Sequence, residues 1–332
     1  MRPGSRDQSR VWLSWWERTG TLRRFGPLLG LGGYALLLLS LGGLQPKHEL
    51  LIAGLLLLAY SGPRVDPFFR FALPFGLVML LYDSMGLYKD KIRGTIRISE
   101  LYRFDQLLFG IRTESGHVLT PNEWWQAHTY PLLDFYTGFF YIFFLALFFF
   151  TAAYFRFVNR RTRNRPASAR ISWAFLWVNA IGYLTYFIYP AAPPWYVARF
   201  GFGPPRMDTL ASPAGGLRFD AMTGIPLFKT FYGASQDVFG AVPSLHVAYP
   251  LLAVCYAFQM KTARGWTVFF FLTMCFSAVY LNHHYVVDLI WGSAYALAVY
   301  FSLEWVAGWS ERRRIREIRH ILRTPARDTE AA

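Results

Sequence analysis

Two short segments in the second half of the chain carry residue types suited to phosphoryl-group chemistry, and the first is the run Gly-Ala-Val-Pro-Ser-Leu-His at residues 240–246. Pro243 suits the first turn of a helix, and Ser244 would then stand at the helix N-terminus. Free backbone N–H groups and the helix dipole favour an anion at such a place. His246 falls within the same turn, so it could reach a phosphate oxygen bound there.

The second segment is Asn-His-His-Tyr-Val-Val-Asp at residues 282–288. His284 and Asp288 are four residues apart, which puts them on one face of a helix. The carboxylate could accept a hydrogen bond from one ring nitrogen and leave the other as an unprotonated nucleophile. A carboxylate near a membrane span is costly unless it is paired, which also favours a functional role for Asp288.

Other interpretations of these residues exist. A single histidine near a helix end is more often an interfacial hydrogen-bonding residue than a catalyst, but two such motifs at one membrane face favour catalysis. His246, His283, His284 and Asp288 could also supply zinc ligands. Neither a His-Glu-x-x-His spacing nor a cysteine pair at metal-ligand spacing is present, so we predict no metal and no cofactor.

The elements that must position these residues are membrane helices. Of the 332 residues, 54% are hydrophobic and 16% are charged, which is too apolar for an ordinary soluble domain. A helical crossing takes about 20 residues. Eight apolar blocks predict an all-α, polytopic transmembrane bundle of about 6–8 spans, and the blocks begin near Phe25, Glu49, Phe68, Leu132, Ile171, Ala241, Trp266 and Tyr285. Cys255 and Cys275 lie inside apolar segments, as small buried side chains whose pairing stays open.

Charge gives the predicted topology. Lys and Arg gather between apolar blocks and at both ends, so the net charge of +14 indicates contact with anionic lipid rather than nucleic acid. The positive-inside rule places both termini in the cytoplasm and both histidine motifs on the extracytoplasmic side. The predicted parts are a basic N-terminal tail (1–24), N-terminal transmembrane helices (25–88), an extracytoplasmic or interfacial loop (89–130), a catalytic transmembrane core (131–308) and a basic C-terminal tail (309–332). That last tail is either a helix on the cytoplasmic leaflet or a solvated segment.

The Pro-Ser-Leu-His run at 243–246 and the His284-x-x-x-Asp288 pair resemble the second and third signature motifs of the type 2 phosphatidic acid phosphatase (PAP2) superfamily, which includes lipid phosphatases and vanadium haloperoxidases. With Tyr-Pro-Ala-Ala-Pro-Pro-Trp-Tyr at 189–196 and a further segment at 102–110, the chain is similar to the inositol phosphorylceramide synthase branch. The resemblance covers about Lys89 to Gly292.

The resemblance implies a PAP2-like core in which His284 attacks phosphorus and becomes a phosphohistidine. Asp288 would orient His284, and His246 would protonate the leaving oxygen and later take up the acceptor's proton. Ser244 and nearby backbone donors would hold the non-bridging oxygens. No metal is needed in this scheme.

The resemblance also implies the substrates. We expect transfer of phosphoinositol, or a related phosphorylated head group, from a phospholipid to a lipid hydroxyl such as that of ceramide. Hydrolysis of a lipid phosphate is the alternative, with water in place of the acceptor. A non-enzymatic lipid transporter or scaffold is a second alternative, which would require the two histidines to lie far apart.

The sequence departs from the superfamily pattern at Ala278, where an arginine usually precedes the catalytic histidine by six residues. A basic residue of the long 191–239 loop is expected to replace that charge. Trp195 is either a wall of the site or an interfacial aromatic residue. The predicted substrate-binding residues are Ser244, Gly240, Pro243, His283, Tyr285, Trp195, Lys229 and Arg206.

Overall fold

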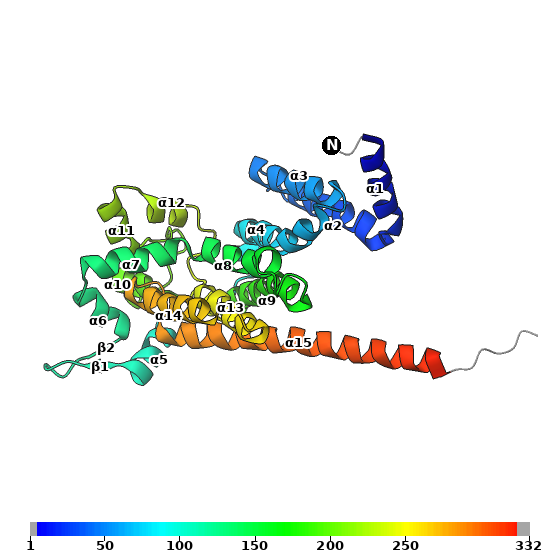
Figure 1. The fold of residues 1–332 in the computed structure, drawn as a ribbon. Coiled ribbons are helices and arrows are strands. Elements are labelled where there is room, and N and C mark those ends of the chain that lie inside the picture. The colour runs from blue at the N-terminus through cyan, green and yellow to red at the C-terminus, as the bar shows by residue number, and fades with distance from the viewer. Residues whose placement is uncertain (1–4, 324–332) are drawn as a thin grey trace, which may run out of the picture.

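The computed structural model describes the backbone of residues 5–323 and the side chains of residues 11–313 and 315. Within this part of the chain, the structure is almost entirely helical (Figure 1). The elements in chain order are α1 (Ser5–Arg18), α2 (Thr21–Ser40), α3 (Pro46–Tyr60), α4 (Asp66–Ile92), α5 (Glu100–Phe109), β1 (Ile111–Arg112), β2 (Val118–Leu119), α6 (Pro121–Ala127), α7 (Pro131–Ile142), α8 (Phe144–Ala153), the π-helical turn η1 (Tyr154–Val158), α9 (Pro166–Ile188), α10 (Pro194–Phe200), α11 (Gly216–Thr223), α12 (Leu227–Gly233), α13 (Leu245–Met260), α14 (Arg264–Tyr280) and α15 (Val286–Arg323).

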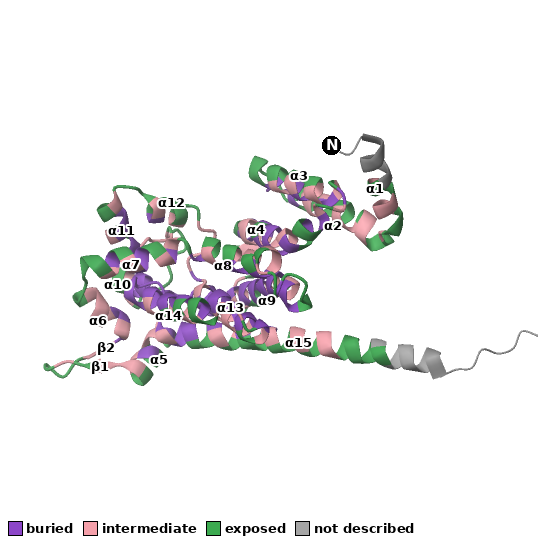
Figure 2. Cartoon of the chain, in the orientation of Figure 1, coloured by how far each residue is buried: buried purple, intermediate pink, exposed green. Residues whose placement is uncertain are grey.

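Helix α13 is the centre of the bundle. It packs against α9, α14 and α15, and its buried positions include the small residues Ala248, Ala253 and Ala257. Small side chains let helix backbones approach closely, which is how membrane helices gain packing energy without a hydrophobic driving force. Figure 2 shows the buried residues concentrated along α9, α13 and α14, whereas α2 and α3 carry few buried residues and residues 301–313 of α15 are mostly exposed.

Three described helices are long and apolar enough to cross a membrane: Asp66–Ile92, Pro166–Ile188 and Val286–Arg313. The pair Pro131–Ile142 and Phe144–Val158, bent by 55°, could form a fourth span. Helices α3, α13 and α14 have 15, 16 and 17 residues, fewer than the ~20 that a perpendicular crossing takes. The predicted count of 6–8 spans is therefore not confirmed, because turns cut several apolar blocks into shorter helices.

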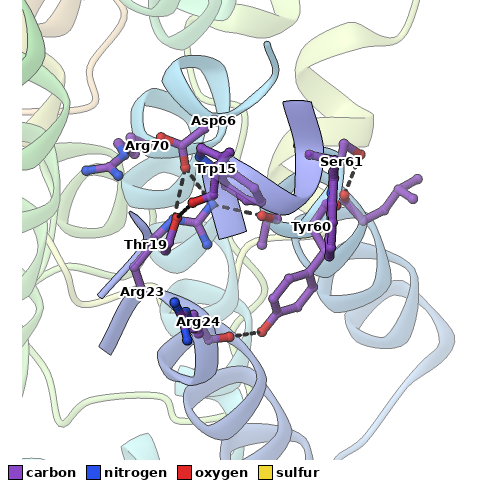
Figure 3. A network of polar contacts seen from close by, with 11 residues as sticks. Trp15, Thr19, Arg23, Arg24, Tyr60, Ser61, Asp66 and Arg70 are labelled. Atoms are coloured by element: carbon purple, nitrogen blue, oxygen red, sulfur yellow. Dashed lines mark hydrogen bonds and ion pairs between the residues drawn. The ribbon is translucent and has the colours of Figure 1, made fainter. Parts of the chain in front are cut away.

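A polar network fastens the N-terminal hairpin of α2 and α3 to the start of α4 (Figure 3). Arg23 donates to Asp66 Oδ1 from Nε at 2.9 Å and from Nη2 at 2.6 Å, and Nη2 also donates to the carbonyl of Ala59 at 2.8 Å. Arg70 Nε donates to Asp66 Oδ2 at 2.6 Å. The Arg23 guanidinium of α2 thus joins α3 to α4, because it contacts the Asp66 carboxylate and also satisfies a carbonyl at the open end of α3.

At the other end of the chain, α15 runs without a break from the bundle to Arg323 (Figure 1). Arg170 of α9 pairs with Glu304 at 2.5 Å and so fixes α15 along the bundle before it extends beyond it. Arg312 and Arg313 lie on this extension. Residues 324–332 of the predicted basic tail lie outside the described residues, and so do the first four residues of the N-terminal tail.

The Asp66 network gives a test of stability. We expect Asp66→Ala to lower the free energy of unfolding by about 3 kcal/mol, because it leaves the largely buried guanidinium of Arg23 without its partner. The matched control is Arg70→Ala, since the Arg70 side chain is 61% exposed and its loss should cost about 0.5 kcal/mol or less. Thermal unfolding of the purified chain in detergent compares the two variants. Equal losses for both would contradict the assignment.

Candidate active site

The two histidine motifs meet at the end of the bundle where α13 and α15 begin. His246 lies in the first turn of α13, and His284 lies in the turn between α14 and α15. His246 Nδ1 and His284 Nε2 are 3.1 Å apart, although the residues are 38 positions apart in the sequence. Both histidines line one cavity. The fold therefore presents two imidazoles at hydrogen-bonding distance to a single enclosed space.

The second nitrogen of His284 is held by two acceptors. Nδ1 lies 2.9 Å from the carbonyl oxygen of Ala241 and 3.5 Å from Asp288 Oδ2. Because a carbonyl can only accept, Nδ1 carries the proton and Nε2 presents its lone pair toward His246. The Ala241 carbonyl was not predicted from sequence. It is the nearer of the two acceptors, so the backbone shares the orienting role expected of Asp288.

The local geometry around Asp288 differs from the prediction. His284 lies before the first residue of α15, so the two residues do not share a helix face. Asp288 stands in the first turn of α15, where its Oδ2 accepts a hydrogen bond from the Tyr285 N–H at 2.9 Å. The carboxylate therefore satisfies a free donor at the helix N-terminus while it approaches His284.

The starts of α13 and α15 are in direct backbone contact. The Ser244 N–H donates to the Asp288 carbonyl at 3.0 Å. A Cβ atom at Gly292 would lie 2.2 Å from the Ser244 carbonyl oxygen, so only glycine permits this approach. Ser244 is the N-cap of α13 and Pro243 precedes it, which corrects the prediction that Pro243 occupies the first helical turn. The Ser244 Oγ is buried and makes no hydrogen bond among the described residues.

The segment 191–195 is hydrogen-bonded to both histidine motifs and to the residue before the first of them. The Ala191 N–H donates to the Phe239 carbonyl at 2.7 Å, and the Ala241 N–H donates to the Ala191 carbonyl at 3.4 Å. The Trp195 N–H, four residues later, donates to the Asn282 carbonyl at 3.2 Å. The Trp195 side chain is only 6% exposed and lines the cavity, so in this structure it is a wall of the site.

The cavity has a volume of about 270 Å³ and is lined mainly by aromatic and aliphatic side chains. Its ionisable lining residues other than tyrosines are His246, His283, His284 and Asp237. Within the described part of the chain, no Lys or Arg lines it. A phosphate bound here would therefore depend on helix termini and hydrogen-bond donors rather than on a neighbouring cation.

His283 is stacked between two tyrosines. Its ring centroid lies 4.9 Å from that of Tyr141 and 4.6 Å from that of Tyr232, and both pairs are nearly parallel. Burial, with a smaller effect of the neighbouring His284, lowers the pKa of His283 to about 3. His283 is therefore neutral at physiological pH. Tyr141 also stacks on His246 at 4.5 Å, so one tyrosine fixes the orientation of two of the cavity's histidines.

The remaining predicted binding residues are placed differently. Gly240 lines the cavity, whereas Ser244, Pro243 and Tyr285 are outside its lining. Lys229 and Arg206 are exposed and are not brought to the cavity. The fold of the loop explains this, because Asp220 accepts the Lys229 N–H and the Arg206 guanidinium lies over another loop side chain, the ring of Phe200, at 4.8 Å.

Two other basic residues of the same loop also remain outside the cavity. Arg218 forms an ion pair with Asp134 at 2.5 Å and donates to Gln126. Arg199, like Arg206, has its guanidinium over Phe200, at 5.1 Å. None of the basic residues considered from sequence therefore replaces the charge that is missing at Ala278.

Two polar residues of the 89–130 region, neither predicted as a site residue, support the turn that carries His284. Asn122 Nδ2 donates to the carbonyls of Val279 and His284, both at 3.0 Å. Asp105 Oδ1 accepts the Val287 N–H at 3.0 Å at the start of α15. The sequence feature that could have pointed to these residues is the length of the 89–130 region, which exceeds that of a plain connector between helices.

Asp105 gives a test of pH dependence. Burial, with a smaller contribution from the nearby Asp288, raises the pKa of Asp105 to about 7 from 3.8. The folded state therefore binds more protons than the unfolded state between about pH 4 and pH 7, and stability falls as the pH rises through that window. Asp105→Asn should remove this fall, which is on the order of 3 kcal/mol, in thermal unfolding measured at pH 4 to 8. A wild-type slope that persists in the variant would contradict this.

Comparisons with known proteins place the chain in a family. A family model described as the PAP2 superfamily matches residues 100–302. The chain is 32% identical over 269 residues to a phosphoinositol dihydroceramide synthase of Bacteroides thetaiotaomicron, a match that covers 79% of this chain and 85% of that protein. No solved structure matches the chain.

Two fungal proteins are also similar. The inositol phosphorylceramide synthase of Candida albicans is 30% identical over 249 residues, which is 72% of this chain and 48% of that protein. The inositol phosphorylceramide synthase catalytic subunit of Saccharomyces cerevisiae is 27% identical over 241 residues, 72% of this chain and 57% of that protein. The chain thus spans about half the length of these fungal relatives. It belongs to the PAP2 superfamily, as an integral membrane enzyme similar to the inositol phosphorylceramide synthases.

Proposed function

We propose that the enzyme transfers phosphoinositol from a phospholipid to the hydroxyl of a ceramide-like lipid through a phosphohistidine at His284. The observation that carries the proposal is the separation of 3.1 Å between His284 Nε2 and His246 Nδ1, with the His284 Nδ1 proton held by Ala241. This is the arrangement of a nucleophile beside an acid–base group. The printed names of the relatives support the choice of donor and acceptor class.

In the first step, His284 Nε2 attacks the phosphorus of the donor. The bond between phosphorus and the glycerol oxygen breaks, and His246, which enters this step as an imidazolium, gives its proton to that oxygen and becomes neutral, so diacylglycerol leaves. The imidazole of His284 then carries the phosphorylated head group and a positive charge. Ala241 and Asp288 stabilise that charge through the Nδ1 proton.

In the second step, the acceptor hydroxyl attacks the same phosphorus. His246, now neutral, takes up the hydroxyl proton, and the bond from phosphorus to Nε2 breaks. The product is the phosphorylated acceptor lipid, and His284 returns to its starting tautomer. Because His246 serves as acid and then as base, each full transfer leaves the protonation of the pair unchanged.

The negative oxygens would be held at the N-terminus of α13. The first-turn N–H groups have no partners within the helix, and two residues of that turn, Leu245 and His246, line the cavity. This source of positive potential replaces the arginine of the usual motif. Ala278, at the arginine's position, is fully buried, and its carbonyl accepts the N–H groups of His283 and His284.

The proposed topology follows the charge pattern. The end of the bundle with the histidines would face the extracytoplasmic side, and the extension of α15 with Arg312 and Arg313 would lie at the anionic cytoplasmic leaflet. The donor and acceptor lipids would reach the cavity from the outer leaflet.

The test uses the full chain purified in detergent and phosphatidylinositol labelled in the head group. Label should enter a new lipid only when ceramide is added, and His284→Ala should reduce transfer by at least about a thousandfold. His117→Ala, which removes an exposed histidine of the β1–β2 turn, is the control and should leave transfer unchanged. Label should also remain on wild-type protein denatured in base, where phosphohistidine is stable. Release of water-soluble label regardless of acceptor would indicate a hydrolase, and transfer surviving in His284→Ala would refute the mechanism.

A second test concerns the close approach of α13 and α15. Gly292→Ala puts a methyl group against the Ser244 carbonyl, so the helices must separate and carry His246 away from His284. Since misplacement by about 1 Å can cost a hundredfold in rate, we expect a loss of about that size. Gly265→Ala is the matched control, because nothing lies within 4 Å of its Cβ. Equal activities of the two variants would show that the junction does not control the site.

A further inference from the structure

One wall of the cavity is formed by the chain that leads into the Gly240 motif. Ser235, Asp237 and Val238 line it, together with Tyr82 from α4. Among the described residues that line this cavity, Asp237 is the one carboxylate. The proposed transfer does not use it. Burying a charged carboxylate costs free energy, so the contacts of Asp237 indicate its role.

Asp237 is buried and only partly satisfied. Its Oδ1 accepts hydrogen bonds from Arg93 Nη2 at 2.7 Å and from the Phe239 N–H at 3.1 Å. The Asp237 side chain is 4% exposed and that of Arg93 is 5% exposed. Its second oxygen, Oδ2, is buried without a hydrogen-bond partner among the described residues. Buried polar atoms in native structures are normally paired, so this oxygen has capacity for a ligand.

Helix α4 holds this wall in place. The Tyr82 hydroxyl is 3.1 Å from Ser235 Oγ and accepts the Gln236 N–H at 3.3 Å. Lys89 donates to the Gln236 carbonyl. Residues 235 and 236 are thus fixed by side chains of α4, and Asp237 is fixed by Arg93, the residue that follows α4. The wall is preorganised, and it presents two hydroxyl groups beside the carboxylate.

The charge around Asp237 limits what can bind. A carboxylate in an aromatic cavity often indicates a site for a quaternary ammonium group. Here Arg93 already neutralises the carboxylate, and Lys89 adds a second positive charge nearby. An ammonium head group would therefore add uncompensated positive charge in a buried place. A neutral group with several hydroxyls fits better, because it can donate to Oδ2 and also bond to the hydroxyls of Tyr82 and Ser235.

We propose that Asp237 is the head-group subsite of the donor lipid and selects a neutral polyol over a cationic amine. The proposal rests on the phosphoinositol transfer proposed above and specifies the residue that recognises the inositol ring. The position is suitable, because Asp237 precedes Ala241, the acceptor of the His284 proton, by four residues, so their Cα atoms are at most about 14 Å apart. Both residues line the same cavity. A ring attached to phosphorus at His284 can extend toward Asp237.

The kinetic test compares wild type with Asp237→Asn, which keeps the shape of the side chain and removes its charge. We expect KM for phosphatidylinositol to rise at least about tenfold, the size of losing hydrogen bonds to a charged group, with a smaller change in kcat. Asp90→Asn is the matched control, because Asp90 is 60% exposed, lies 3.8 Å from the same Arg93 and does not line the cavity. It should behave as wild type. An unchanged KM in Asp237→Asn would overturn the proposal.

A head-group series tests the same selection on the wild-type protein and does not depend on how a variant folds. Phosphatidylglycerol, a neutral diol donor, should be used more readily than phosphatidylcholine or phosphatidylethanolamine. Asp237→Asn should lower the preference for phosphatidylglycerol over the two amine donors, whereas Asp90→Asn should leave that preference unchanged. Wild type that uses the amine donors as well as the polyol donors would overturn the proposal.

A binding measurement separates this proposal from the proposed reaction. The probes are glycerophosphoinositol and glycerophosphocholine, titrated into His284→Ala protein, in which no turnover occurs. Glycerophosphoinositol should bind more tightly, and adding Asp237→Asn should weaken it at least about tenfold. If wild type transfers nothing to ceramide but this difference is present, the subsite stands and the reaction is wrong. If transfer occurs but the two probes bind alike, the reaction stands and the subsite is wrong.

Discussion

The backbone hydrogen bond from Ser244 to the Asp288 carbonyl is the constraint on which the rest of the site depends. It joins the start of α13 to the start of α15, and Gly292 makes the approach sterically possible. A second bond, from His284 Nδ1 to the Ala241 carbonyl, crosses between the same two segments. Two bonds between one pair of segments fix both their separation and their rotation. This backbone geometry holds the two imidazoles at the hydrogen-bonding distance of 3.1 Å.

Support for that junction comes mostly from segments between the long helices. Asn122 fixes the carbonyl of His284, Asp105 caps the start of α15, and Ala191 pairs with the strand-like segment before the α13 motif. Connecting segments often carry function on a rigid scaffold, but here the short helices α5 and α6 and the segment around Ala191 also support the turn that carries His284. The long helices supply the packed bundle, and the irregular segments set the positions of individual atoms.

The all-helical class and the meeting of the two histidine motifs could be inferred from sequence, because hydropathy and short motifs are local properties. The Ala241 carbonyl could not, since a backbone acceptor has no residue signature. Asn122 acts through a tertiary contact that no spacing reveals. Lys229 was selected for its charge, but the loop around it folds so that its side chain faces outward. Pro243 precedes the N-cap and does not lie in the first turn as predicted, because a proline at either place looks alike in sequence.

The long-range hydrogen bonds around the site affect how the enzyme folds during its synthesis. Backbone hydrogen bonds around the site join residues that lie far apart in the sequence: Arg97 with Ala192, Ala191 with Phe239, and Trp195 with Asn282. Closing such long loops costs entropy that only the completed contacts repay. During synthesis, His284 and the start of α15 emerge after α1 to α14. A nascent chain therefore completes most of its helices before His284 can meet His246.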